Sequence, residues 1–113
     1  MDSILTSIKK LLGIIEDDTS FDTDIIIHIN SVFMILYQLG IGEEGFCIED
    51  STTTWSDYLG DRINLLSSVR SYIYLKVRLL FDPPSSSANI ESISNLISEL
   101  EWRLNVAVDP GEG

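Results

Sequence analysis

The sequence predicts an all-α domain built from four main helices and a short irregular insert. Three observations support this fold class. Apolar residues recur every three or four positions in four segments of the chain, which is the spacing of a helix face. Three of these segments end at a glycine or at a pair of prolines, residues that stop helices. With 113 residues, of which 44% are hydrophobic, the chain can bury one core but has no room for a second.

The first helix is expected from about Ser3 to Leu12. Ser3 can cap it, because a serine hydroxyl accepts a hydrogen bond from a free amide of the first turn. Gly13 ends the helix or lies just beyond it, and an acidic linker at residues 16–20 follows. The apolar residues of this helix recur at helical spacing: Ile4, Leu5, Ile8, Leu11 and Leu12.

The second helix is expected to start at a cap formed by Asp22 or Thr23 and to run to about Leu39, with Gly40 just after its end. Four isoleucines in the short span of residues 25–29 would also suit a strand, but the length of the segment and the glycine favour a helix. Apolar residues cover well over half of its circumference. Such a helix is expected at the centre of its domain or between two neighbours.

The irregular insert follows the second helix. Residues 40–50 are expected to form a loop, within which residues 46–49 could form a small β element, either a short strand or the edge of a hairpin. Residues 55–59 are expected to form a single helical turn.

The third long helix is expected from about Arg62 to Phe81, capped by Asp61. Its apolar residues form two stripes, which predicts contacts on two sides. Pro83 and Pro84 stop it, because the residue before a proline is disfavoured in the helical region.

The fourth helix is expected from about Ala88 to Ala107, with a domain that spans residues 1–108 and a flexible tail at residues 109–113. Its apolar residues alternate steps of three and four, which predicts near-parallel or antiparallel packing on one other helix. This heptad-like seam consists of Ile90, Ile93, Ile97, Leu100, Leu104 and Ala107.

The composition excludes several classes of partner. The formal net charge is -11, from 18 acids and 7 bases, so the surface as a whole repels duplex DNA and anionic membranes. The most apolar stretch, residues 25–39, is shorter than the roughly 20 residues that cross a bilayer. The N-terminus lacks the basic and apolar regions of a secretory signal. A single cysteine, Cys47, cannot form an internal disulfide, which suits a reducing cytoplasm.

Two motifs resemble ligand sites in their letters alone. Residues 40–45 match G-x-G-x-x-G, but the nucleotide fingerprint follows a strand and opens a helix, and Glu43 and Glu44 would repel phosphate. The acids of residues 16–24 suggest calcium, but Thr23 and Ile29 occupy the positions where a calcium loop needs glycine and its closing glutamate. A helix stop and solvated capping acids are the favoured interpretations.

His28 and Cys47 are the remaining candidates for chemistry. A zinc site or an acid–base relay needs further partners, and this sequence has one histidine and one cysteine. We therefore interpret His28 as a structural residue that can pair with Asp24 one turn earlier, and Cys47 as a partly buried small hydrophobe. No catalytic, cofactor-binding or metal-binding residues are predicted, and the protein is not expected to be an enzyme.

The predicted third helix is the one basic segment of the chain. Residues 62–81 contain four bases and no acid. These bases can pair with acidic linkers of the same molecule or with the acidic surface of a neighbouring copy; nucleic-acid contact is the remaining alternative. In a ring, one basic face against one acidic face gives a head-to-tail contact that closes by rotation. The candidate interface residues are Arg62, Arg70, Lys76, Arg78, Asp17 and Asp18.

Trp102 and Arg103 complete the candidate interface. Trp102 lies about 200° round the helix from Leu100, away from the predicted seam. A large aromatic residue off the core stripe is either an interface anchor or a cover for a loop of the same fold. Arg103 can pair with Glu99, four residues earlier, beside it.

The order and spacing of several segments resemble one protein family, although none of them is a chemical signature. The segments are residues 8–13, residues 21–42, Thr54-Trp55, YIYLKVRLLFDPP at residues 72–84, and residues 99–105. Together they resemble the small head–tail connector (adaptor) or DNA packaging proteins of long-tailed bacteriophages, over about residues 4–107. The loop at residues 40–49 and the short tail are the least typical parts.

The resemblance implies a mostly helical, non-catalytic subunit of a ring of about twelve copies. Such a ring is a virion component of the head–tail neck, made in the host cytoplasm. It lies below the portal protein, extends the DNA channel and offers a platform for head-closure or tail-completion proteins. DNA is expected to pass an acidic channel wall without specific binding. The alternative is a small acidic regulatory protein, such as a DNA mimic, which would be a monomer or dimer with rows of carboxylates.

Overall fold

The computed structural model describes residues 3–108 of the chain, and these residues form an all-α domain. The prediction of four main helices and an irregular insert is confirmed. No strand occurs between residues 3 and 108, apart from an isolated antiparallel bridge between Ser3 and Thr54. The elements are α1 (Ile4–Leu11), α2 (Asp22–Gln38), α3 (Trp55–Leu59), the 3-10 helix η1 (Gly60–Leu65), α4 (Leu66–Phe81) and α5 (Ser87–Val108).

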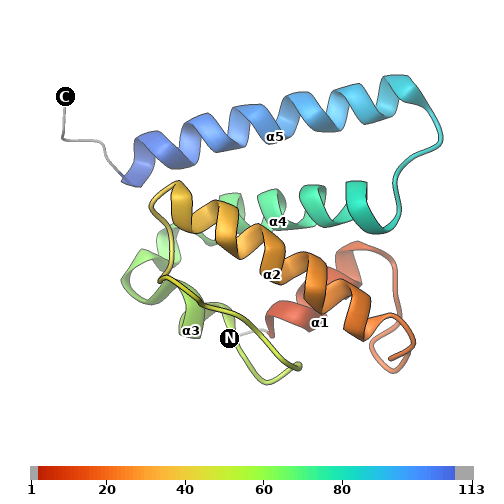
Figure 1. Ribbon diagram of the computed structural model, residues 1–113, viewed down its shortest axis with the longest axis horizontal. Helices are drawn as coiled ribbons and strands as arrows, with labels where there is room; N and C mark the ends of the chain where they lie inside the picture. Colours follow the sequence, from red (N-terminus) through yellow and green to blue (C-terminus); the bar gives the residue numbers. More distant parts are fainter. Residues whose placement is uncertain (1–2, 109–113) are drawn as a thin grey trace.

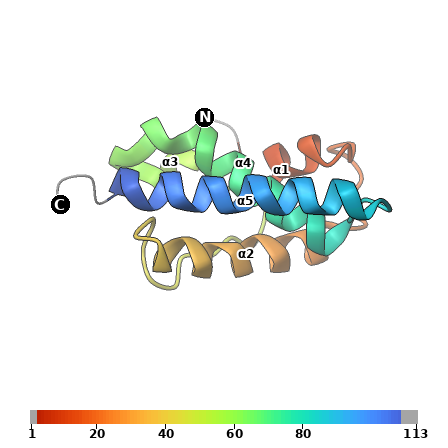
Figure 2. The same cartoon turned by 90° about the horizontal axis from the view of Figure 1, so that it is seen from above.

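Helix α4 lies at the centre of the domain (Figure 1). It packs against α1, α2, α5 and η1, and buries Val69, Tyr72, Ile73 and Val77. Seen from above, α2 lies along one edge of the molecule, while α1 and α3 lie along the opposite edge (Figure 2). The sequence predicted a central or sandwiched position for α2. Within one chain this is wrong, because α2 packs on one side against α1 and α4 and its outer side remains exposed.

The insert is held on α1 by backbone and side-chain hydrogen bonds. Ser3 caps α1 as predicted, because its Oγ accepts the amide of Thr6 at 3.2 Å. The amide of Ile4 donates to the carbonyl of Thr53 at 3.0 Å, and the indole of Trp55 donates to Ser7 Oγ at 3.0 Å. The fully buried Trp55 therefore joins the predicted helical turn α3 to α1.

Two predicted helix starts are wrong. Helix α2 begins at Asp22 after Phe21, which makes no capping hydrogen bond, and the carboxylate of Asp22 pairs with Lys9 instead. The third long helix does not begin at residue 62 with an Asp61 cap. The backbone of Arg62 is non-helical (φ -98°, ψ 27°), so a 3-10 segment precedes α4, which begins at Leu66.

The expected β element at residues 46–49 is absent. Asn30 on α2 takes the place of a partner strand, because its side-chain amide pairs with both backbone groups of Ile48. The Asn30 Nδ2 group donates to the carbonyl of Ile48 at 3.0 Å, and the amide of Ile48 donates to Asn30 Oδ1 at 2.8 Å. With Ile48 buried in this way, the loop is fixed against α2 without a sheet.

Helix α5 packs on α4 over a shorter seam than predicted. Of the seam, Ile97 and Leu104 are buried, whereas Ile90 and Ala107 are exposed. A hydrogen bond supplements this contact, since the hydroxyl of Tyr72 donates to Glu101 Oε2 at 2.6 Å. The predicted tail at residues 109–113 lies outside the described residues.

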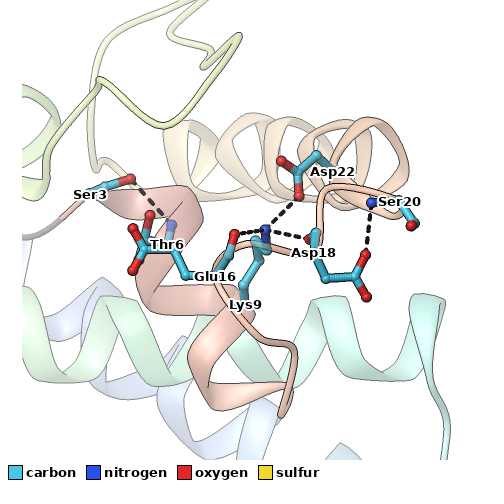
Figure 3. Close-up of polar contacts among 7 residues, drawn as sticks. All are labelled: Ser3, Thr6, Lys9, Glu16, Asp18, Ser20 and Asp22. Atoms are coloured by element: carbon cyan, nitrogen blue, oxygen red, sulfur yellow. Dashed lines mark hydrogen bonds and ion pairs between the residues drawn. The ribbon is translucent and has the colours of Figure 1, made fainter.

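The buried Lys9 joins α1, the acidic linker and α2 (Figure 3). Its side chain is 4% exposed, and its ammonium group has three oxygen partners. It donates to the carbonyls of Glu16 and Asp18 at 3.0 and 2.8 Å and pairs with Asp22 Oδ1 at 2.9 Å. An ammonium group has three protons, so this arrangement satisfies it completely.

We expect Lys9→Met to lower the free energy of unfolding by about 3 kcal/mol, because it leaves the buried Asp22 oxygen and two carbonyls without their cation. The matched control is Lys10→Met on the exposed side of the same helix, which should cost less than about 0.5 kcal/mol. Urea unfolding followed by circular dichroism measures both changes. Equal effects of the two substitutions would contradict this role of Lys9.

Candidate functional site

The residues that suggested ligand chemistry are not arranged for it. Residues 40–45 form a loop after α2 and do not open a helix, so their amides do not form a phosphate cradle at a helix N-terminus. Within residues 3–108, no three His, Cys, Asp or Glu side chains lie together as potential metal ligands. His28 is half-buried on α2 and makes no hydrogen bond or ion pair with Asp24. No helix in the described part of the chain is long and apolar enough to cross a membrane.

The acids of the linker serve the local structure. Asp18 Oδ1 accepts the amide of Ser20 at 3.0 Å. This contact with Ser20, and to a lesser degree the positive charge of Lys9, lowers the pKa of the Asp18 carboxyl group. The backbone carbonyls of Glu16 and Asp18 bind Lys9, while the side chain of Asp17 remains exposed. Of the two linker acids predicted at an interface, Asp17 is thus the more accessible.

A pocket of about 530 Å³ lies between the second half of α2 and the loop at residues 43–47; we call it the α2 pocket. Its rim includes the exposed apolar side chains of Met34 (71% exposed) and Tyr37 (45%). Two exposed carboxylates, Glu43 and Glu44, line the loop side. The complete lining is Asn30, Phe33, Met34, Tyr37, Gln38, Glu43, Glu44, Gly45, Phe46 and Cys47.

Three aromatic rings, packed edge-to-face or at a tilt, support the loop of the α2 pocket. The centroid of Phe33 on α2 lies 5.2 Å from that of Phe46 in the loop and 4.5 Å from that of Tyr58 on α3. The Tyr58 hydroxyl is buried without a hydrogen-bond partner among the described residues, and this burial raises its pKa. Gly42 lies so close to this ring that a Cβ atom would be 2.6 Å from Tyr58 Cε1.

Cys47 is exposed on the rim of the α2 pocket, and the expectation of a partly buried residue is wrong. Its neighbours explain this orientation. Phe46 turns inward onto Phe33 and Tyr58, and Ile48 is buried against Asn30. In an extended segment successive side chains point to opposite sides, so Cys47 points outward.

The four bases of residues 62–81 form no ion pair with an acid in the part of the chain that the structure describes. Between residues 3 and 108 the ion pairs are Lys9–Asp22 and Arg103–Glu99. The intramolecular pairing that the sequence allowed is therefore not observed. Arg62 is exposed on η1 and Arg70 is partly exposed on α4.

The other two bases of this segment contact aromatic residues. Lys76 Nζ lies 5.9 Å from the centre of the Tyr72 ring, and Arg78 Nη1 donates to the Tyr74 hydroxyl at 3.2 Å. Both side chains are partly exposed, so their charges contribute to the surface of α4.

Trp102 projects from α5 into solvent. It is 68% exposed and does not cover a loop of the same fold, which was one of the two alternatives from the sequence. Beside it Arg103 Nη2 pairs with Glu99 Oε1 at 2.7 Å, as predicted. A groove between α4 and α5 lies alongside, and its lining is Ser71, Tyr74, Leu75, Leu96, Glu99, Leu100 and Arg103.

The candidate interface residues therefore occupy separate surfaces. Asp17 and Asp18 lie on the linker, Arg62 on η1, and Trp102 and Arg103 on α5. Sequence reasoning missed the α2 pocket and the buried Lys9. The pocket depends on how a loop folds back on α2, which periodicity does not reveal. Lys9 stands among apolar residues of α1, and that position was an available signal of its burial.

We expect Gly42→Ala to lower the free energy of unfolding by about 3 kcal/mol, because it combines an unfavourable positive φ of 83° with a clash against the Tyr58 ring. Gly45→Ala is the control. Gly45 also has a positive φ, of 78°, but a Cβ there meets nothing within 4 Å, so about 1 kcal/mol of backbone strain is expected. Thermal unfolding of both variants measures the two losses of unfolding free energy, and their difference is the contribution of the contact with the Tyr58 ring. A smaller loss of unfolding free energy for Gly42→Ala than for Gly45→Ala would contradict this contribution.

Comparison with known proteins identifies one family. A family described as "Phage connector protein" matches residues 4–111, nearly the whole chain. No curated protein and no solved structure matches the sequence.

Proposed function

Because the chain belongs to the family of phage connector proteins, we propose that it is a structural subunit of the head–tail neck of a tailed phage. In this proposal, about twelve copies form a ring below the portal protein. The ring extends the DNA channel and joins the head to the tail. Its partners are further copies of itself, the portal protein, and a head-closure or tail-completion protein.

The separation of charge within the fold carries this proposal. The chain has a basic segment, residues 62–81, whose cations have no carboxylate partners in the described part of the molecule. It also has an exposed acidic loop on α2, with Glu43 and Glu44 beside exposed apolar side chains. A surface with one basic and one acidic region favours head-to-tail association of identical copies. Such association closes into a ring when the rotation between neighbouring copies divides a full turn.

The overall acidity supports a passive role toward DNA. A net charge of -11 repels phosphates, so an acidic channel wall lets DNA pass without retaining it. No nucleic-acid binding and no catalysis are part of the proposal. The subunit is made in the host cytoplasm and acts in the assembled virion.

Phage particles that lack this protein are expected to fail in tail attachment and to lose packaged DNA. Electron microscopy and a nuclease-protection assay on particles from a deletion mutant measure both defects. Restoration of the protein from a plasmid is the control. Mutant particles with attached tails and retained genomes would contradict the proposed function.

The native mass of the protein distinguishes the proposed connector function from the alternative of an acidic DNA mimic. The connector is expected to form oligomers near twelvefold, alone or with the portal protein, as measured by native mass spectrometry. A DNA mimic would remain a monomer or dimer under both conditions and would compete with duplex DNA for a DNA-binding protein.

Trp102 is proposed as an anchor for the portal protein, because α5 presents it outward at 68% exposure. Trp102→Ala should weaken portal binding roughly 10- to 100-fold, as expected for a central aromatic anchor, and leave the unfolding free energy nearly unchanged. Leu96→Ala, at 49% exposure on the same helix, is the control for loss of exposed apolar area. Surface plasmon resonance measures the affinity; equal portal affinities of Trp102→Ala and the native chain would contradict this role.

A further inference from the structure

We propose that the α2 pocket is the docking site for η1 and the first half of α4 of a second copy. Glu43 and Glu44 of one subunit then meet Arg62 and Arg70 of the next. This inference rests on the proposed function and names the surfaces through which neighbouring subunits associate.

The distribution of charge along the chain is the first argument. Residues 11–61 contain eleven of the 18 acids and none of the seven bases, whereas residues 62–81 contain four bases and no acid. Apart from Asp22, which pairs with Lys9, the acids of residues 11–61 and the bases of residues 62–81 form no ion pair within residues 3–108. Opposite charges that remain unpaired within each copy can pair between two copies, which fixes their relative orientation.

The placement of the two surfaces is the second argument. The second half of α2 and its following loop lie on one edge of the molecule, while α3, η1 and the start of α4 lie on the opposite edge (Figure 2). Both surfaces are at the same end of the molecule, where α2 ends and α4 begins (Figures 1 and 2). A second copy placed beside the first therefore brings Arg62 and Arg70, which share their surface with the exposed acids Asp57 and Asp61, toward Glu43 and Glu44 without turning end over end.

Such a contact joins two different surfaces of the same chain. Each copy keeps a free α2 pocket on one side and a free η1 surface on the other, so further copies can be added in the same way. Contacts of this kind generate rings when the rotation between neighbours closes, and open filaments when it does not.

Exposed apolar side chains supply the non-polar part of the contact. Met34 and Tyr37 on the rim of the α2 pocket are 71% and 45% exposed. On the opposite surface Ile63, next to Arg62, is 36% exposed. Apolar residues surrounded by charge are typical of an interface with a hydrophobic centre and a polar rim.

The chain's own C-terminal segment fits the α2 pocket poorly. Residues 109–113 carry Asp109 and Glu112 and no base, so Glu43 and Glu44 at the pocket would repel them. A basic segment complements these two carboxylates, and residues 62–81 are the one segment of the chain with several bases and no acid.

Charge reversal tests the pairing directly. Glu43→Lys combined with Glu44→Lys, and Arg62→Glu combined with Arg70→Glu, should each weaken subunit association roughly 10- to 100-fold. An equimolar mixture of these two double variants should assemble again as an alternating ring, and so should one chain that carries all four changes. Native mass spectrometry and analytical ultracentrifugation, with and without the portal protein, measure the assembly.

Two control variants carry similar charge changes elsewhere on the surface. Glu49→Lys combined with Glu91→Lys alters two exposed acids outside the lining of the α2 pocket, and Lys10→Glu alters an exposed base on α1. Both should assemble like the native chain. If the pocket and η1 variants also assemble normally, or if their mixture does not recover assembly, the proposal is wrong.

The single cysteine offers a second, covalent test. Cys47 is exposed on the α2 pocket, so Asn64→Cys on η1 should give disulfide-linked oligomers when assembled rings are oxidised. Asn95→Cys, on an exposed site of α5, is the control and should give few such products. Rings in which Asn64→Cys does not cross-link with Cys47 would overturn the proposal.

Failure of the docking proposal and failure of the proposed function give different results. If rings form and tails attach, but the charge variants and the cross-links have no effect, then the interface lies elsewhere on a genuine connector. If the α2 pocket is shielded from solvent only when another phage protein binds, then that protein, and not a second copy, occupies the pocket. If no ring forms and particles without the protein are normal, the connector function itself is wrong.

Discussion

The buried ammonium group of Lys9 is the contact on which the arrangement of the acidic half of the molecule depends. It reaches two linker carbonyls and the first residue of α2 from a position on α1. Burial of a charge is unfavourable unless it is paired and fully hydrogen-bonded, so the linker can adopt few other conformations around Lys9. Helix α2 therefore starts at a fixed place relative to α1. This start determines where the rest of α2, and the α2 pocket at its second half, lie in the molecule.

The burial of Lys9 also determines the character of the surface. Residues 11–61 contain no base of their own, and the cation that compensates their acids in this structure is hidden inside the fold. The outer side of α2 and its loop consequently combines uncompensated carboxylates with exposed apolar side chains. A surface of this composition is stabilised when cations approach it, and Arg62 of η1 and Arg70 of α4, which form no ion pair within residues 3–108, are suitable cations.

Much of the fold could be predicted from the sequence, because helical spacing and helix stops are local properties. The cap at Ser3, the ends of α2 and α4, and the turn at Trp55 depend on nearby residues, and the structure confirms them. The errors arise where distant residues decide. Asn30 supplies both hydrogen bonds that Ile48 would otherwise need from a strand. Lys9 takes the Asp22 carboxylate away from capping, and Arg62 interrupts what periodicity suggests is one helix.

The candidate surfaces were less predictable than the fold, because exposure depends on which helix becomes central. The sequence of α2 is apolar nearly all round and suggested a buried helix, yet α4 occupies the centre with Tyr72 and Val77 buried. The apolar excess of α2, such as Met34, then remains on the outside. A helix that is more apolar than its position in one chain requires favours a partner that covers its exposed side. In an assembly of several copies, α2 would then lie between two neighbours, as its sequence predicted.

The two helices that pack against each other in the core, α2 and α4, would also form the contact between subunits. Helix α2 packs on α4 inside each copy, and the proposed interface places α2 of one copy against α4 of the next. Along a closed ring this gives an alternating series of α2 and α4 without any flexible linker between them. A load applied by the tail or by packaged DNA would then pass through packed side chains around the whole ring. Helix α5 contributes only two buried residues, Ile97 and Leu104, and would stay outside this series, which leaves its exposed side, with Trp102, available to a different partner.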